Sequence, residues 1–251
     1  MGFSMQRGLV FALHGFLGQG SDWKQVKKEC ANVQGTSANQ LDWITPNLFE
    51  TESDGILSYD QFCESLIKTY QAQLEKSSHR IFIGYSLGGR LGLHLLKHHA
   101  QNFDHFIFVS THPGLASESE KELRKASDTN LSQQITEGNW DQFLQRWNGQ
   151  PVLAGEFGNP NRLQKDFNLA ALRASLQIWS LGEQQDLREL IQNHQQKITW
   201  VVGQKDSKFL NLAEELLQKK ILLNVSRIFS GHRVLFENPK ELASVLLHQL
   251  S

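Results

Sequence analysis

The feature that most limits the fold is an alternation between short apolar runs and amphipathic helical patterns. Apolar strands separated by helices are typical of a parallel sheet covered on both faces. The sequence therefore predicts an α/β fold with a mostly parallel central sheet and helices on both faces. Asp22 is a possible cap for the first helix, in "DWKQVKKEC". The predicted strands are 8–15, 41–48, 79–86, 105–111, 197–204 and 222–229.

The segment between the fourth and fifth apolar runs differs from the rest of the chain. Residues 113–195 are polar with helical patterns and contain no convincing strand. We predict a core of 1–112 and 196–251 with 113–195 as a helical lid inserted between two strands. The insertion leaves from the carboxyl end of one strand, the edge at which open α/β sheets bind ligands.

Composition excludes several classes of protein. The chain has 251 residues and a formal net charge of -1, with no basic stripe, so we expect no nucleic-acid partner. The sequence contains no run of 18 apolar residues, so we expect no membrane span. The two cysteines, Cys30 and Cys63, are predicted to be free thiols. Without a signal-peptide pattern, cytoplasmic location is the expectation. Nothing in the sequence indicates an oligomeric state.

The stretch "GYSLGGR" (84–90) follows one apolar run and opens a helix. Such a junction leaves Ser86 exposed at the sheet edge, while Gly84 and Gly88 remove side chains that would collide across the turn. The backbone N–H of Leu87, at the helix start, is a candidate oxyanion donor. The second candidate donor is the N–H of Phe16, in "HGFLGQGSDW". The alternative is a plain glycine-rich turn.

A serine nucleophile needs a base and an acid that orients the base. In this fold they follow later strands in the order Ser, Asp, His, which selects Asp206 in "GQKDSKF" and His232 in "SGHRVLFENP". Asp206 as a mere helix cap and His232 as a surface histidine remain alternatives. His14 is expected to be structural. The pair His94/His98 has helical metal-ligand spacing but no evident third ligand.

Cations near Ser86 point to an anionic substrate. Arg90 lies one helical turn after Ser86, where a guanidinium is best explained as an anion contact. Arg124 in the insertion is a second candidate, and Lys208 is a weaker one. Trp147 would wall the pocket or pack the insertion. A small-molecule polycarboxylate is the predicted partner.

The chain resembles the α/β-hydrolase superfamily and, within it, the 2-succinyl-6-hydroxy-2,4-cyclohexadiene-1-carboxylate synthase family of menaquinone or phylloquinone biosynthesis. The matching pieces occur in family order along nearly the whole chain: "LHGFLGQGSDW", "GYSLGGRL", "HPGL", "EKELRKASD", "RWNGQPVL", "GQKDSKF" and "GHRVLFENP". Departures include Arg233 and Leu235, where the family pattern has polar residues.

The resemblance implies a lyase that eliminates pyruvate from 5-enolpyruvoyl-6-hydroxy-2-succinyl-cyclohex-3-ene-1-carboxylate, with no metal or organic cofactor. Ser86, His232 and Asp206 would supply the base, and Tyr85 would line the pocket. Two alternatives remain open. One is a serine ester or thioester hydrolase that works through an acyl-enzyme, and the other is a non-catalytic ligand-binding protein on the same fold.

Overall fold

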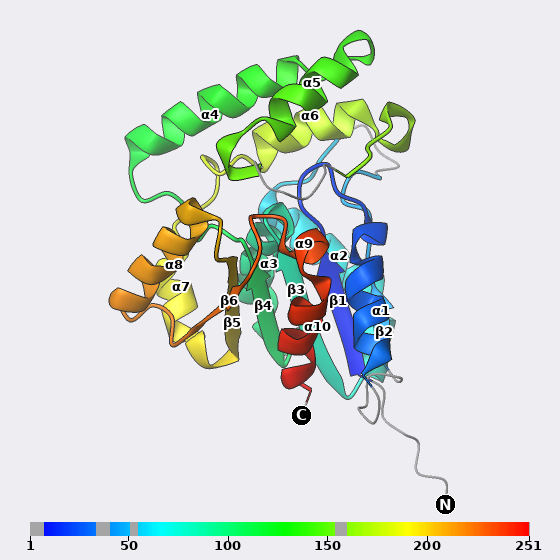
Figure 1. Cartoon of the computed structure of the whole chain (residues 1–251), viewed down its shortest axis with the longest axis vertical. Coiled ribbons are helices and arrows are strands. Elements are labelled where there is room, and N and C mark those ends of the chain that lie inside the picture. Colours follow the sequence, from blue (N-terminus) through cyan, green and yellow to red (C-terminus); the bar gives the residue numbers. More distant parts are fainter. Residues whose placement is uncertain (1–7, 34–40, 51–54, 154–159, 251) are drawn as a thin grey trace, which may run out of the picture.

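The computed structural model describes residues 8–33, 41–50, 55–153 and 160–250 (Figure 1). It contains one parallel six-stranded sheet in the order β2-β1-β3-β4-β5-β6, which confirms the predicted α/β class. Register pairs Leu13 with Gly84, so the loops after β1 and β3 begin side by side. The strands are β1 (Gly8–Leu13), β2 (Leu41–Ile44), β3 (His79–Tyr85), β4 (His105–Val109), β5 (Ile198–Gly203) and β6 (Val225–Ile228).

Helices cover both faces of the sheet, as predicted. Successive strand residues point to opposite faces. Phe11 therefore packs in the core beneath α2 (Tyr59–Lys76), α3 (Leu87–His99) and α8 (Ser207–Gln218). Val10 packs in the core beneath α1 (Lys24–Asn32), α9 (Val234–Glu237) and α10 (Pro239–His248). Continuous apolar strands thus supply a buried side chain to each face in turn.

The segment between β4 and β5 carries helices, and its described residues contain no strand. We call α4 (Glu118–Gln133), α5 (Trp140–Asn148) and α6 (Leu169–Ile178) the helical layer. It lies above the carboxyl ends of the strands (Figure 1). The last helix of the segment, α7 (Arg188–Asn193), lies lower, beside α8.

Some local expectations were wrong. A 3₁₀ turn over Gly20–Trp23 precedes α1, so Asp22 does not cap that helix. Its carboxylate instead accepts a hydrogen bond from the backbone N–H of Gln19. The second strand ends at Ile44 rather than near 48, just before Pro46, which has no N–H to donate to a ladder.

Both cysteines are buried and free, as predicted. Within the described ranges, no helix has the length and apolar character needed to cross a membrane.

Candidate active site

Ser86 occupies a strained turn between β3 and α3. Its φ of 51° and ψ of -108° fall outside the helical and extended regions, a conformation that costs free energy and needs support. A Cβ on Gly84 would lie 2.6 Å from the carbonyl oxygen of Gly88, and one on Gly88 would lie 2.3 Å from that of Leu13. Both glycines are therefore required, Gly84 across the turn as predicted and Gly88 against the end of β1.

Ser86, His232 and Asp206 are brought together from the ends of three strands. The Oγ of Ser86 lies 3.3 Å from Nε2 of His232, whose Nδ1 lies 2.6 Å from Oδ2 of Asp206. Asp206 also caps α8, since its Oδ1 accepts the backbone N–H of Phe209 at 3.2 Å. Asp206 is thus both a helix cap and the partner of His232, because each of its two carboxylate oxygens accepts from a different donor.

The surroundings of His232 fix its ring. Asp206 and His232 are 5% and 6% exposed, so little water competes for their contact. Ser110, at the end of β4, donates its hydroxyl to the backbone carbonyl of His232 at 3.0 Å. The rings of Tyr85 and Phe209 lie 5.6 and 4.7 Å from the imidazole, between centroids. This packing holds Nε2 toward Ser86.

Two backbone N–H groups lie near the serine. Leu87 is the first residue of α3, and Phe16 follows β1, whose end adjoins that of β3. In the described part of the chain, neither N–H has a hydrogen-bond acceptor. The helix N-terminus adds positive potential at this point. The two N–H groups therefore remain candidate donors to an oxygen anion.

His14 supports this loop as a structural residue, as expected. Its Nδ1–H donates to the carbonyl of Gly15 at 2.8 Å, and its Nε2 accepts the N–H of Leu48 at 3.0 Å. Complete burial lowers its pKa from 6.5 to about 4, so the ring is neutral near pH 7.

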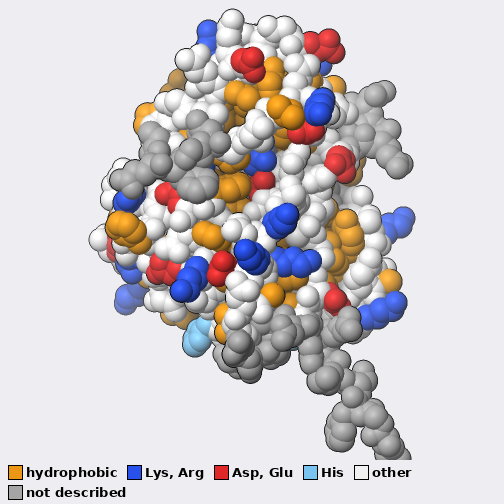
Figure 2. All heavy atoms as spheres, turned by 45° about the vertical axis from the view of Figure 1, so that its right-hand side comes forward, with side chains coloured by type: hydrophobic (Ala, Val, Ile, Leu, Met, Phe, Trp, Pro, Cys, Tyr) orange, Lys and Arg blue, Asp and Glu red, His pale blue; other side chains and the backbone are white. Residues whose placement is uncertain are grey.

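A pocket of about 300 Å³ opens at Ser86, between the core and the helical layer. Figure 2 shows hydrophobic side chains gathered where the layer meets the core, with basic and acidic side chains among them. Trp147 from α5 packs on Phe16 with a ring-centroid distance of 4.6 Å, so it both walls the pocket and joins the two parts. The predicted site residues that line the pocket are Phe16, Tyr85, Ser86, Leu87, Arg90, Arg124, Trp147, Lys208 and His232. Asp206 lies behind His232, outside the lining.

The arginines of the pocket differ in how their charge is compensated. Arg124 donates to the buried carboxylate of Asp128 at 2.8 Å, and Arg162 pairs with Asp22 at 2.7 Å. Arg90 donates to the neutral hydroxyl of Tyr59. No carboxylate among the described residues lies within ion-pair distance of Arg90. Arg90 therefore projects a net positive charge into the pocket.

Three further lining residues were not predicted as site residues: His112, Arg162 and Arg233, the last of which was noted only as a departure from the family pattern. Burial, followed by nearby cations, lowers the pKa of His112 to about 3. Its Nδ1 accepts the N–H of Gly114 at 3.1 Å, so the neutral ring carries its proton on Nε2. His112 lies three residues after the end of β4, and that position after a strand was the usable signal. Arg233, next to His232, donates to Oδ1 of Asn148 at 2.6 Å, joining the core to α5.

The described residues contain no cluster of three or more His, Cys, Asp or Glu side chains arranged to hold a metal ion. His94 and His98 instead share Oδ1 of Asp60, at 2.9 and 3.1 Å.

Comparison with known proteins identifies the family of the chain. No protein-family model matches the chain. A 2-succinyl-6-hydroxy-2,4-cyclohexadiene-1-carboxylate synthase from Enterobacter sp. (strain 638) is 30% identical over 247 residues, covering 95% of this chain and 89% of the relative.

Solved structures agree on the architecture. MenH from S. aureus superposes with a TM-score of 0.81 at 19% identity, covering 97% of this chain and 93% of that one. A thermophilic esterase from Thermogutta terrifontis has a TM-score of 0.72 at 16% identity, covering 98% and 90%. The fold is the α/β-hydrolase fold, and the chain belongs to the 2-succinyl-6-hydroxy-2,4-cyclohexadiene-1-carboxylate synthase family.

Proposed function

We propose that this chain is a lyase that eliminates pyruvate from 5-enolpyruvoyl-6-hydroxy-2-succinyl-cyclohex-3-ene-1-carboxylate, giving 2-succinyl-6-hydroxy-2,4-cyclohexadiene-1-carboxylate. Family membership supports the reaction class. One observation supports the assignment of this reaction to the pocket. A hydrogen-bonded serine, histidine and aspartate lie at the same pocket as an arginine whose hydrogen-bond partner is a neutral tyrosine hydroxyl. A substrate with three carboxylates suits such a site.

In the proposed mechanism, Ser86 and His232 act together as the base. His232 takes the hydroxyl proton of Ser86, and Oγ removes the ring proton at C2, next to the succinyl ketone. The Asp206 carboxylate accepts the Nδ1–H of His232 and stabilises the imidazolium that forms. A 3.3 Å separation between Oγ and Nε2 is within the range of free enzymes, which tighten with substrate bound.

The electron pair left at C2 is delocalised onto the ketone oxygen as an enolate. The N–H groups of Phe16 and Leu87 would donate to that oxygen. On collapse, the C2=C3 bond forms, the C3=C4 double bond moves to C4=C5, and the C5–O bond breaks. His232 returns its proton to the departing enolpyruvate, which tautomerises to pyruvate. The elimination is redox-neutral, and no acyl-enzyme forms.

The pocket arginines differ in whether a protein carboxylate already pairs with them, and this difference ranks them as substrate contacts. Arg90 is assigned a substrate carboxylate, since no carboxylate among the described residues forms an ion pair with it, whereas Arg124 is paired with Asp128. Tyr85 and Trp147 would pack against the ring. The helical layer acts as the lid, because residues from α4 and α5 complete the pocket wall.

Pyruvate release, coupled to NADH oxidation, tests this proposal in the wild type, Ser86→Ala and Arg90→Ala. We expect release by the wild type and losses of at least ~100-fold in both variants. Absence of pyruvate together with a burst of acyl-enzyme on aryl esters would assign the chain to the hydrolases instead. Full biological function of Ser86→Ala would favour a non-catalytic binding protein.

A further inference from the structure

Tyr59 stands between the pocket and a polar cluster behind it. It is the first residue of α2 and is 6% exposed. Its hydroxyl oxygen lies 2.9 Å from the carbonyl oxygen of Trp179 and 3.2 Å from that of Ser180, at the end of α6. Carbonyls only accept, so the single hydroxyl proton goes to them, and an oxygen lone pair faces Nη1 of Arg90.

The hydroxyl stays neutral while it makes these contacts. Burial raises the pKa of Tyr59 to about 12, so the phenol keeps its proton throughout the physiological range. A carboxylate in the same place would cancel the charge of Arg90, as Asp128 does for Arg124. A neutral acceptor fixes one N–H of the guanidinium and leaves its charge and its other donors for a ligand.

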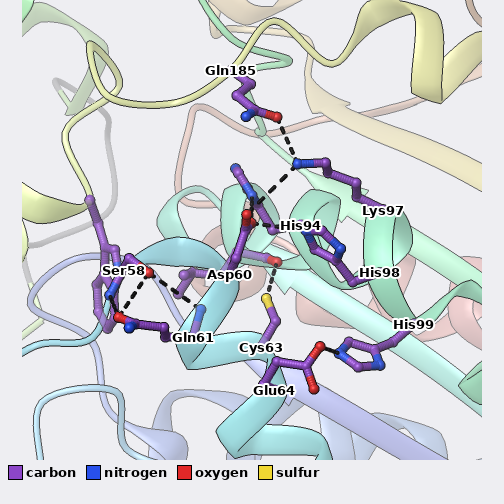
Figure 3. Close-up of polar contacts among 12 residues, drawn as sticks. Ser58, Asp60, Gln61, Cys63, Glu64, His94, Lys97, His98, His99 and Gln185 are labelled. Atoms are coloured by element: carbon purple, nitrogen blue, oxygen red, sulfur yellow. Dashed lines mark hydrogen bonds and ion pairs between the residues drawn. The ribbon is translucent and has the colours of Figure 1, made fainter.

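The ring of Tyr59 packs against a histidine on α3. The imidazole of His94 stacks on it with centroids 4.3 Å apart and planes 14° apart. Figure 3 shows Asp60 facing His94, with Lys97 and His98 on the same side of α3. Burial lowers the pKa of His94 to about 4, so the ring is neutral and its Nδ1–H donates to Asp60.

We propose that Tyr59 is a positioning residue, whose hydroxyl fixes the guanidinium of Arg90 and ties it to the end of α6 without neutralising it. This inference rests on the proposed role of Arg90 as a contact for a substrate carboxylate. Tyr59 does not touch the reacting atoms. It sets where the positive charge lies, and so affects binding of the substrate rather than proton removal.

Tyr59→Phe removes the hydroxyl and keeps the ring that stacks on His94. Loss of one hydrogen bond to a charged group predicts a KM for the enolpyruvoyl substrate about 10-fold higher, with kcat within ~2-fold of wild type. Tyr70→Phe is the matched control: it lies on the same helix, half-buried against Phe11, outside the pocket lining. Its KM and kcat should equal those of the wild type.

A double variant separates positioning from general structural support. If Tyr59 acts through Arg90, adding Tyr59→Phe to Arg90→Lys changes KM by less than ~2-fold. An unchanged KM in Tyr59→Phe, or a full 10-fold increase in the Arg90→Lys background, would overturn the proposal. A lower melting temperature of Tyr59→Phe with an unchanged KM would likewise contradict the proposal, because it would show that Tyr59 supports the fold alone.

A binding measurement keeps this test independent of the proposed reaction. The probe is 4-(2-carboxyphenyl)-4-oxobutanoate, a stable aromatic dicarboxylate that carries the product's succinyl group and ring carboxylate. If the wild type released no pyruvate, the proposed function would fail, and calorimetric titration of this probe would still decide the role of Tyr59. About 10-fold weaker binding to Tyr59→Phe would support positioning, and equal binding to both proteins would refute it.

Discussion

Gly88→Ala tests whether the close approach of α3 to β1 forms the oxyanion site. The new Cβ would lie 2.3 Å from the carbonyl oxygen of Leu13 and 2.6 Å from that of His14. Both obstacles are backbone, so the helix start and the loop after β1 must separate by about 1 Å to reach ordinary contact. That movement would displace the N–H groups of Leu87 and Phe16 relative to each other. A misplacement of about 1 Å in a catalytic site costs about 100-fold in rate.

We therefore expect kcat for pyruvate release to fall about 100-fold in Gly88→Ala. Stability should fall less, because overpacking costs about 1–3 kcal/mol and the alanine returns nearly 1 kcal/mol of helix propensity. Gly92→Ala is the control on the same helix, since its Cβ would meet the ring of Phe82 at 2.1 Å, within the core. It should lower the urea midpoint and leave kcat near the wild-type value. A folded Gly88→Ala protein with wild-type kcat, or an equal loss of kcat in Gly92→Ala, would refute this role of Gly88.

Other perturbations separate catalysis from stability. Asp206→Asn should lower kcat by about 10⁴-fold through loss of the charged partner of His232, while urea unfolding shifts by less than ~1 kcal/mol because the amide oxygen still caps Phe209. His14 binds a proton in the unfolded state below its ordinary pKa of 6.5 but in the folded state only below about 4, so stability should fall as pH drops through that window. Protonation of His14 in the unfolded state should lower the free energy of unfolding by about 2 kcal/mol at pH 5 relative to neutral pH. In His14→Gln, the slope of the free energy of unfolding against pH in this window should be smaller by the equivalent of about one bound proton. The double variant Arg124→Met/Asp128→Asn should raise KM only a few-fold, measured by pyruvate release, because it removes a pair whose charges already compensate each other.

Local sequence patterns were sufficient for the sheet and for the turn at Ser86. Gly84 carries a steric requirement that arises where a strand meets the next helix, and these two elements are contiguous in the chain, whereas the requirement at Gly88 comes from the distant end of β1. The pairing of Asp206 with His232 followed from fold topology, since each residue lies in the loop after a strand. Their placement needed no knowledge of side-chain packing.

Contacts between distant segments could not be predicted in this way. Arg162 and Asp22 are 140 positions apart, and nothing near either one indicates the other. Tyr59 is likewise joined to Arg90 only by the packing of α2 on α3. The pairing of Arg124 with Asp128 is different, because an i, i+4 spacing on one helix is visible in the sequence and should have signalled a compensated charge.

In the proposed mechanism Ser86, His232 and Asp206 together remove the C2 proton, and no acyl-enzyme forms. The most direct test is kcat/KM for substrate carrying deuterium at C2, with the intact protein weighed by mass spectrometry during turnover. We expect a primary isotope effect clearly above unity in the wild type and no covalent mass increase on the chain. An isotope effect of one, together with an adduct that disappears in Ser86→Ala, would contradict it.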